Sequence, residues 1–189
     1  MAENLNLEQL QTPSSVFFLF CATGDLARRK LFPDIYRLYR EGKLADDFAV
    51  IGVARRPRTQ EEFREDLYQS IQEFCRYKAE LNEEWYAFAQ HFEYKALDIN
   101  DVNGFRELKE QTENMEERYH IPGNRMFYLA LAPELFGSVS FNLEKGGMLE
   151  GPGWKRLVIE KPFGYDLKSA ETLNEQIRQV FKEEDIYRI

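Results

Sequence analysis

A short stretch of small and basic residues has the composition of an anion-binding turn. It follows an apolar run, contains one glycine, and ends in three consecutive cations where a helix-like pattern begins. Small residues let the backbone approach a phosphate, and the free N–H groups at a helix start attract an anion. The stretch therefore predicts a phosphate site, with a simple tight turn and a solvated basic face as the alternatives. Its candidate binding residues are Ala22, Thr23, Gly24, Asp25, Leu26, Arg28, Arg29 and Lys30.

A second group of cations stands where the next apolar run ends. Arg55, Arg56 and Arg58 follow Ala54 directly or within a few residues. Sheets that bind NAD usually end this strand with Asp or Glu, which bonds the ribose 2′-hydroxyl. Arginine matches a 2′-phosphate in charge and geometry, whereas a carboxylate would repel it. The pattern favours NADP over NAD, and a surface arginine cluster without a ligand is the alternative.

A lysine follows the apolar run that ends at Ile159, in the sequence Glu160-Lys161-Pro162. A lysine at the carboxyl end of a sheet strand occupies the usual ligand crevice of such folds, and the alternative is a strand that proline simply ends. The two histidines, His91 and His120, are not near a ligand-facing strand end, so we expect structural or solvated roles for both. Nothing in the sequence predicts a metal site.

The elements that must hold these residues alternate between strands and helices. Continuous apolar runs of this kind are typical of parallel strands that are covered on both faces. We predict an α/β fold: a doubly wound, mostly parallel, Rossmann-like sheet with helices on both faces. Strands are expected over 16–22, 48–54, 92–97, 125–131, 156–159 and 186–189. Helices are expected over about 31–38, 60–74, 102–119, 133–146 and 167–180, with helix or loop over 80–90.

Length and composition indicate one globular domain. The chain has 189 residues, of which 43% are apolar and 31% charged, and its net charge is −8. That acidity disfavours nucleic-acid binding, and no apolar run is long enough to span a membrane. We expect a flexible arm over 1–15 without a signal peptide, and one domain over 16–189. Cys21 and Cys75 are then expected to be reduced cytoplasmic thiols, with Cys21 buried.

Five segments, taken in order, resemble signatures of the glucose-6-phosphate dehydrogenase family. The first resembles GDLA-[KR]-[KR]-K-x-x-P, and the others resemble the ends of the second and third strands, the N-R-[LIM]-F-Y segment and the E-K-P-F-G segment. The resemblance covers nearly the whole chain from about Val16. The segments are Gly24–Pro33, Val53–Arg55, Leu97–Ile99, Asn124–Ala130 and Ile159–Gly164.

The resemblance implies roles for the candidate residues on the adenosine side of an NADP site. The stretch from Ala22 to Lys30 would wrap the NADP diphosphate, and Arg55 would hold the adenosine 2′-phosphate. Asp98 and Ile99 would line the adenine-ribose side or the cofactor groove. One position departs from the family pattern, because many relatives have glycine where this chain has Cys21. A positive φ there would cost roughly 1 kcal/mol, so either the turn shifts or Cys21 takes a negative φ.

The resemblance also implies a reaction. The family oxidises C1 of glucose 6-phosphate to 6-phosphogluconolactone, the first step of the pentose phosphate pathway, with a histidine as base and NADP as hydride acceptor. Tyr128 would lie beside the nicotinamide half, and Lys161 would contact both cofactor and sugar. The family's D-H-Y-L-G-K segment, its general-base histidine and its α+β substrate and dimerisation domain would lie beyond Ile189. We therefore expect no catalytic residue in this chain and no activity from it alone, and a homo-oligomer for the longer protein.

Two other functions compete with this reading. Glucose-fructose oxidoreductases and inositol dehydrogenases also combine a dinucleotide fold with an E-K-P motif, but they usually carry a fuller glycine motif. A non-catalytic NADP-sensing module could be complete at this length. It would lack the Glu160-Lys161-Pro162 sequence.

Overall fold

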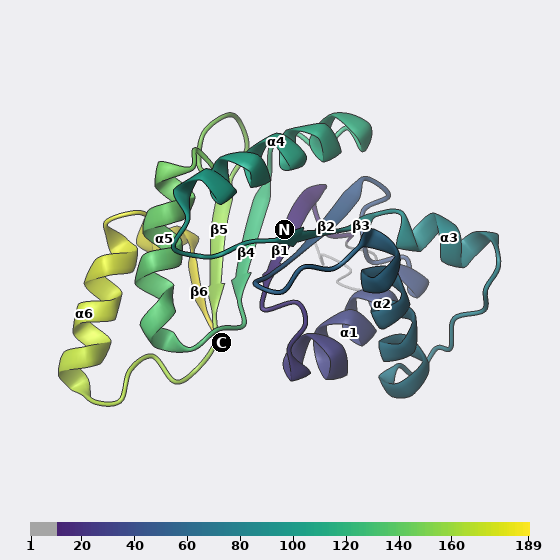
Figure 1. The fold of residues 1–189 in the computed structure, drawn as a ribbon, viewed down its shortest axis with the longest axis horizontal. Helices are drawn as coiled ribbons and strands as arrows, with labels where there is room; N and C mark the ends of the chain where they lie inside the picture. The colour runs from purple at the N-terminus through teal and green to yellow at the C-terminus, as the bar shows by residue number, and fades with distance from the viewer. Residues whose placement is uncertain (1–10) are drawn as a thin grey trace, which may run out of the picture.

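The apolar runs pair side by side into one parallel sheet. The computed structural model describes residues 11–189, and its six strands have the order β3-β2-β1-β4-β5-β6 (Figure 1). The chain thus builds outward from β1 in one direction and then in the other, which is the doubly wound arrangement. The predicted fold class is confirmed. The strands are β1 Ser15–Phe20, β2 Phe48–Ala54, β3 Phe92–Ala96, β4 Arg125–Leu129, β5 Lys155–Ile159 and β6 Ile186–Arg188.

The helices form where the sequence places both a cap and an apolar face. Thr59 and Glu62 make a capping box at the start of α2, and Asp166 accepts a hydrogen bond from the Ser169 N–H at the start of α6. The segment over 80–90 contains a helix, α3. The helices are α1 Phe32–Arg40, α2 Gln60–Phe74, α3 Glu83–Ala89, α4 Val102–Arg118, α5 Phe136–Lys145 and α6 Leu167–Arg178. Short helical turns are η2 Ala27–Leu31, η3 Pro133–Leu135 and η4 Glu183–Asp185.

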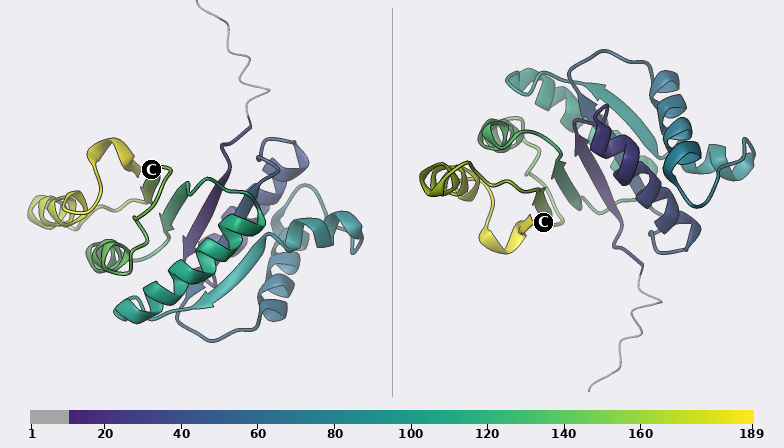
Figure 2. Two further views of the ribbon diagram at one scale, coloured as in Figure 1. Left: turned by 90° about the horizontal axis from the view of Figure 1, so that it is seen from above. Right: turned by 90° about the horizontal axis from the view of Figure 1, so that it is seen from below.

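Helices lie on both faces of the sheet, as the two views in Figure 2 show. One apolar core holds Phe105 of α4, Val139 of α5 and Ile177 of α6. The other holds Tyr36 of α1 and Phe88 of α3, together with residues of α2. Because both faces are covered, the central strand β1 is almost entirely apolar, which is what the continuous run in the sequence predicted.

The boundaries differ from the predicted ones at the two ends of the first strand. β1 ends at Phe20 rather than Ala22, because Cys21 takes a left-handed φ of 69° and turns the chain. At the other end, the Thr12 N–H donates to the Lys43 carbonyl at 2.8 Å, so part of the predicted arm is bonded to the domain. The rest of that prediction, over 1–10, lies outside the described residues.

Asn124 and Arg125 of the N-R-x-F-Y segment serve the fold at the amino end of the sheet. Arg125 is buried, pairs with Glu116 at 2.7 Å and donates to the Met148 carbonyl at 2.9 Å. The Asn124 amide bridges the Ser14 carbonyl and the Trp154 N–H. Within 11–189 no helix combines the length and hydrophobicity needed to cross a membrane.

Candidate functional site

A cleft of about 520 Å³ opens at the carboxyl ends of β1, β2 and β3. Ligands of doubly wound folds bind at this edge, where the strand order reverses beside β1. The cleft is lined by the turn after β1, by Arg55 and Arg56 after β2, and by Asp98 and Ile99 after β3. Residues more than seventy positions apart in sequence (Gly24 and Asp98, for example) therefore share one cavity.

The turn after β1 is closed by short backbone hydrogen bonds. The Gly24 N–H donates to the Cys21 carbonyl at 2.9 Å, and the Ala22 N–H donates to the Val53 carbonyl at 3.1 Å. A Cβ on Gly24 would lie 2.9 Å from the Cys21 Sγ and 3.0 Å from its carbonyl oxygen, so one or both of these atoms would have to shift. The cysteine three residues earlier therefore favours glycine at position 24. Thr23 and Gly24 both line the cleft.

The turn forms because the Cys21 backbone adopts a left-handed conformation, which is strained for a residue with a Cβ. Its φ is 69°, which excludes the negative φ that the sequence left open as one alternative. The residue is half-buried rather than buried as predicted, and it lines the cleft. Burial raises the pKa of the Cys21 thiol, so the group stays protonated at neutral pH.

The first basic cluster does not reach the cleft. The Arg28 guanidinium pairs with Glu73 at 2.5 Å, and Arg29 pairs with Asp25 at 2.7 Å. Both guanidinium groups also lie over the ring of Phe74, at 5.8 and 5.4 Å from its centroid. They are thus held against the end of α2. Lys30 is exposed on the same short helical turn, and none of the three cations lines the cleft.

The second basic cluster does reach the cleft. Arg55 and Arg56 are exposed and line it, whereas Arg58 is paired with Asp66. Among residues 11–189, neither Arg55 nor Arg56 forms an ion pair with a carboxylate. The Arg56 backbone is held by the Tyr94 hydroxyl, which donates to its carbonyl at 2.6 Å. Two guanidinium groups without an ion-pair partner in the described part of the chain therefore line this cavity.

The loop after β3 supplies the opposite side of the cleft. The Asp98 carboxylate accepts from the Asn100 N–H at 2.9 Å and from its side-chain amide at 3.2 Å. The Ile99 carbonyl accepts from the Asn142 amide at 2.6 Å, which ties the loop to α5. Asn100 also lines the cleft, together with Arg56 and Cys21. These three were not predicted as binding residues, although each of them adjoins a predicted one in sequence.

Tyr128 and Lys161 lie apart from this cleft. Tyr128 is 7% exposed, and its ring packs 5.8 Å from that of Phe17 in an apolar groove of about 380 Å³. Its hydroxyl donates to the Glu160 carboxylate. Burial is the larger cause that raises the Tyr128 pKa, and this hydrogen bond raises it further. Lys161 is exposed at the end of β5, where its N–H donates to the Ile189 carbonyl at 3.1 Å.

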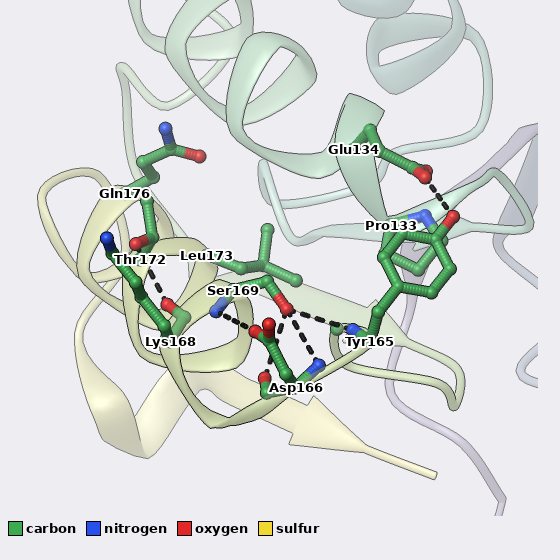
Figure 3. A pocket seen from close by; sticks show the side chains of 10 residues that line it. Pro133, Glu134, Tyr165, Asp166, Lys168, Ser169, Thr172, Leu173 and Gln176 are labelled. Atoms are coloured by element: carbon green, nitrogen blue, oxygen red, sulfur yellow. Dashed lines mark hydrogen bonds between the residues drawn. The ribbon is translucent and has the colours of Figure 1, made fainter.

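A second hollow, of about 420 Å³, lies between η3 and the start of α6 (Figure 3). The Tyr165 hydroxyl crosses it to donate to the Glu134 carboxylate. Below it, the Ser169 hydroxyl accepts from the Tyr165 N–H at 2.9 Å and the Asp166 N–H at 3.0 Å. These contacts organise the chain just after Lys161 and Pro162, and the sequence did not indicate them.

The histidines are remote from the cleft. His91 is stacked between Phe48 and Tyr119, with ring centroids 4.2 and 4.3 Å away, and its Nδ1 lies 2.6 Å from the Phe48 carbonyl oxygen. His120 is exposed and has a φ of 53°. Within the described part of the chain, no three His, Cys, Asp or Glu side chains gather closely enough to hold a metal ion.

Residues 18–189 match the family model described as glucose-6-phosphate dehydrogenase, NAD binding domain. The chain is 45% identical over 179 residues to glucose-6-phosphate 1-dehydrogenase of Bacillus subtilis, with 95% of this chain and 35% of the relative aligned. It is 38% identical over 170 residues to that of Leuconostoc mesenteroides, covering 90% of this chain and 34% of the relative. The chain thus spans about a third of the length of these curated relatives.

Solved structures give the same picture. A glucose-6-phosphate dehydrogenase in complex with its substrate glucose 6-phosphate superposes with a TM-score of 0.83 at 33% identity, covering 95% of this chain and 37% of that one. The enzyme from Mycobacterium avium superposes with a TM-score of 0.78 at 31% identity, covering 94% and 36%. The likeness therefore extends over nearly the whole chain.

Proposed function

The chain belongs to the glucose-6-phosphate dehydrogenase family, and from that premise we propose that it is the NADP-binding portion of an enzyme that oxidises glucose 6-phosphate to 6-phosphogluconolactone. The matched family model is a dinucleotide-binding domain, so a nicotinamide dinucleotide is the cofactor class. The preference for NADP, the sugar substrate and the complete reaction are our proposals for the longer protein that would carry this domain.

One observation carries the preference for NADP. Two guanidinium groups that no carboxylate neutralises within residues 11–189, Arg55 and Arg56, line the cleft beyond the end of β2, the position where NAD-binding sheets carry an acidic residue. A 2′-phosphate would satisfy both groups by charge-assisted hydrogen bonds. With NAD bound, they would face only a neutral hydroxyl. The geometry therefore supports Arg55 as the holder of the 2′-phosphate, with Arg56 beside it.

The other residues fit the same ligand. The turn from Ala22 to Leu26 would present its backbone to the diphosphate, which the position of Thr23 and Gly24 in the cleft lining supports. Asp98 and Ile99, which also line the cleft, would lie on the adenine-ribose side. Arg28 and Arg29 are already paired with Glu73 and Asp25, so they would have to leave these carboxylates to touch a phosphate. Lys30, the next residue, remains a proposed contact of the cofactor diphosphate.

Lys161 would stand where cofactor and sugar meet, since it follows β5 at the ligand edge of the sheet. When bound, the dinucleotide supplies the hydride acceptor; this chain supplies binding, orientation and one amine near the sugar. The general base that takes the C1-hydroxyl proton is proposed to lie outside residues 1–189, as is the homo-oligomer interface. We also propose a cytoplasmic location, which two free cysteine thiols support.

Calorimetry with NADP and NAD tests the cofactor assignment. We expect the purified chain to bind NADP more tightly than NAD, and Arg55→Ala to weaken NADP binding by about tenfold or more, because a hydrogen bond to a charged group is worth about 1.5–3 kcal/mol. Binding of NAD should not change. Arg58→Ala is the matched control, because Arg58 is paired with Asp66 and does not line the cleft.

Two outcomes would contradict different parts of the proposal. If the chain bound NAD and NADP equally, Arg55 would lose its assigned role while the dinucleotide site stood. If it bound neither dinucleotide, the proposed function itself would fall.

A further inference from the structure

Tyr128 is a buried residue of the apolar groove beside α1, and its hydroxyl is hydrogen-bonded. The ring is 7% exposed and packs against Phe17 on the neighbouring strand β1. Its hydroxyl donates to the carboxylate of Glu160, two residues beyond Val158, its pairing partner on β5. A buried tyrosine hydroxyl needs a partner, and here that partner belongs to the segment that leads into Lys161.

The backbone on either side of Lys161 is held as well. The Ile189 N–H donates to the Ile159 carbonyl at 3.0 Å, and the Lys161 N–H donates to the Ile189 carbonyl at 3.1 Å, which extends the pairing of β5 with β6 past its assigned end. A fixed Glu160 side chain on a paired backbone limits the directions open to the next side chain. Lys161 is therefore preceded by one side-chain anchor, the Tyr128–Glu160 hydrogen bond.

A second anchor follows Lys161. Figure 3 shows Tyr165 directed toward Glu134 of η3, and Asp166 and Ser169 bonded to each other at the start of α6. The Ser169 hydroxyl receives both the Tyr165 and the Asp166 N–H groups. The segment between the two anchors is only a few residues long, and Lys161 is its first member.

We propose that Tyr128 is a positioning residue, which holds Glu160 and thereby directs the Lys161 amine into the ligand crevice. The proposal rests on the proposed function, in which Lys161 contacts the nicotinamide side of the cofactor. It assigns Tyr128 an indirect role: the hydroxyl acts through Glu160, and the ring acts by packing. Neither is required to touch the dinucleotide.

A comparison of two ligands tests this role. NADPH carries both halves of the cofactor, whereas adenosine 2′,5′-bisphosphate carries only the half expected in the cleft at Arg55. We expect Tyr128→Phe to weaken NADPH binding roughly three- to tenfold, the equivalent of one hydrogen bond, and to leave adenosine 2′,5′-bisphosphate binding unchanged. A general loss of structure would weaken both ligands, so the selectivity separates positioning from destabilisation.

Three further variants test whether Tyr128 acts through Glu160 on Lys161. Glu160→Gln keeps an acceptor oxygen for the Tyr128 hydroxyl and should bind NADPH nearly as the unchanged chain does. In a Lys161→Ala background, Tyr128→Phe should have no further effect, because the residue that it positions is gone. Tyr119→Phe is the matched control: it also loses a hydroxyl hydrogen bond, to the Gln90 carbonyl at 2.8 Å, but it lies beside His91 and away from the cleft.

The outcomes distinguish this inference from the proposed function. If the unchanged chain binds NADPH and Tyr128→Phe binds it equally well, the inference is overturned and the proposed function stands. It is also overturned if Tyr128→Phe weakens NADPH binding as much with Lys161→Ala as without it. A chain that binds neither ligand would overturn both.

Discussion

At the scale of single residues, the turn after β1 couples two positions that the sequence presents separately. Cys21 takes a left-handed φ of 69°, and its Sγ occupies the space that a side chain at position 24 would need. The cysteine therefore keeps the glycine-like conformation that the turn requires, at a cost in strain of roughly 1–2 kcal/mol. The strain is borne at a residue that lines the cleft.

This strain predicts an order of stability for two variants. Cys21→Gly relieves the left-handed conformation, whereas Cys21→Ala removes the same thiol and keeps the Cβ. We expect the glycine variant to be more stable than the alanine variant by about 1 kcal/mol, although glycine also raises the entropy of the unfolded chain. Urea denaturation followed by circular dichroism measures both. An alanine variant as stable as the glycine variant would show that the turn is unstrained.

At the scale of elements, one aromatic stack joins two strands of the sheet to a helix. His91, just before β3, lies between Phe48 of β2 and Tyr119 at the end of α4. Burial lowers the His91 pKa; the hydrogen bond to the Phe48 carbonyl and the charge of Asp47 act in the opposite direction but are smaller. The neutral imidazole is therefore the form that joins these three elements.

The lowered pKa predicts a pH dependence of stability. The unfolded chain, with a His pKa near 6.5, binds the proton more readily than the folded one, so protonation favours unfolding. The stabilisation is complete above about pH 6.5 and is lost as the pH falls from there toward the folded-state pKa. Between about pH 7.5 and 5.5, the unchanged chain should lose more unfolding free energy than His91→Phe, which keeps the aromatic stack without a titrating group. Equal losses in denaturation experiments at both pH values would contradict this account.

At the scale of the whole molecule, the cleft and the two histidines lie in different places. The cleft offers cationic and backbone groups for a dinucleotide, but neither histidine lines it: His91 is half-buried in an aromatic stack and His120 is exposed elsewhere. An apolar groove bounded by Phe17 and Met126 remains on the sheet beside α1. The chain spans 34–35% of the curated relatives described above.

We therefore predict that residues 1–189 alone do not oxidise glucose 6-phosphate, even where they bind NADP. General-base catalysis commonly contributes 10²–10⁴-fold, and among residues 11–189 no histidine lines this cleft. The production of NADPH, followed by its absorbance at saturating substrate, should stay at background. A full-length family enzyme assayed in parallel shows that the conditions permit turnover. A rate near that of the full-length enzyme would refute the prediction.

The sequence by itself determined the alternation of strands and helices, the parallel sheet and the position of the ligand edge. These follow from local information: apolar runs of strand length, caps such as Thr59 with Glu62, and the rule that the carboxyl ends of parallel strands share one edge. Arg55 and Asp98 therefore met at the cleft as expected.

Only the tertiary structure decided which way the remaining side chains turn. Arg28 meets Glu73 from 45 positions away, and Tyr128 meets Glu160 from 32 positions away. Nothing near these residues in sequence encodes such partners, because each contact depends on how a helix or strand packs against another. The conformation of Cys21 is of the same kind, since the chain must turn there to bring the Ala22 N–H to the Val53 carbonyl of the next strand.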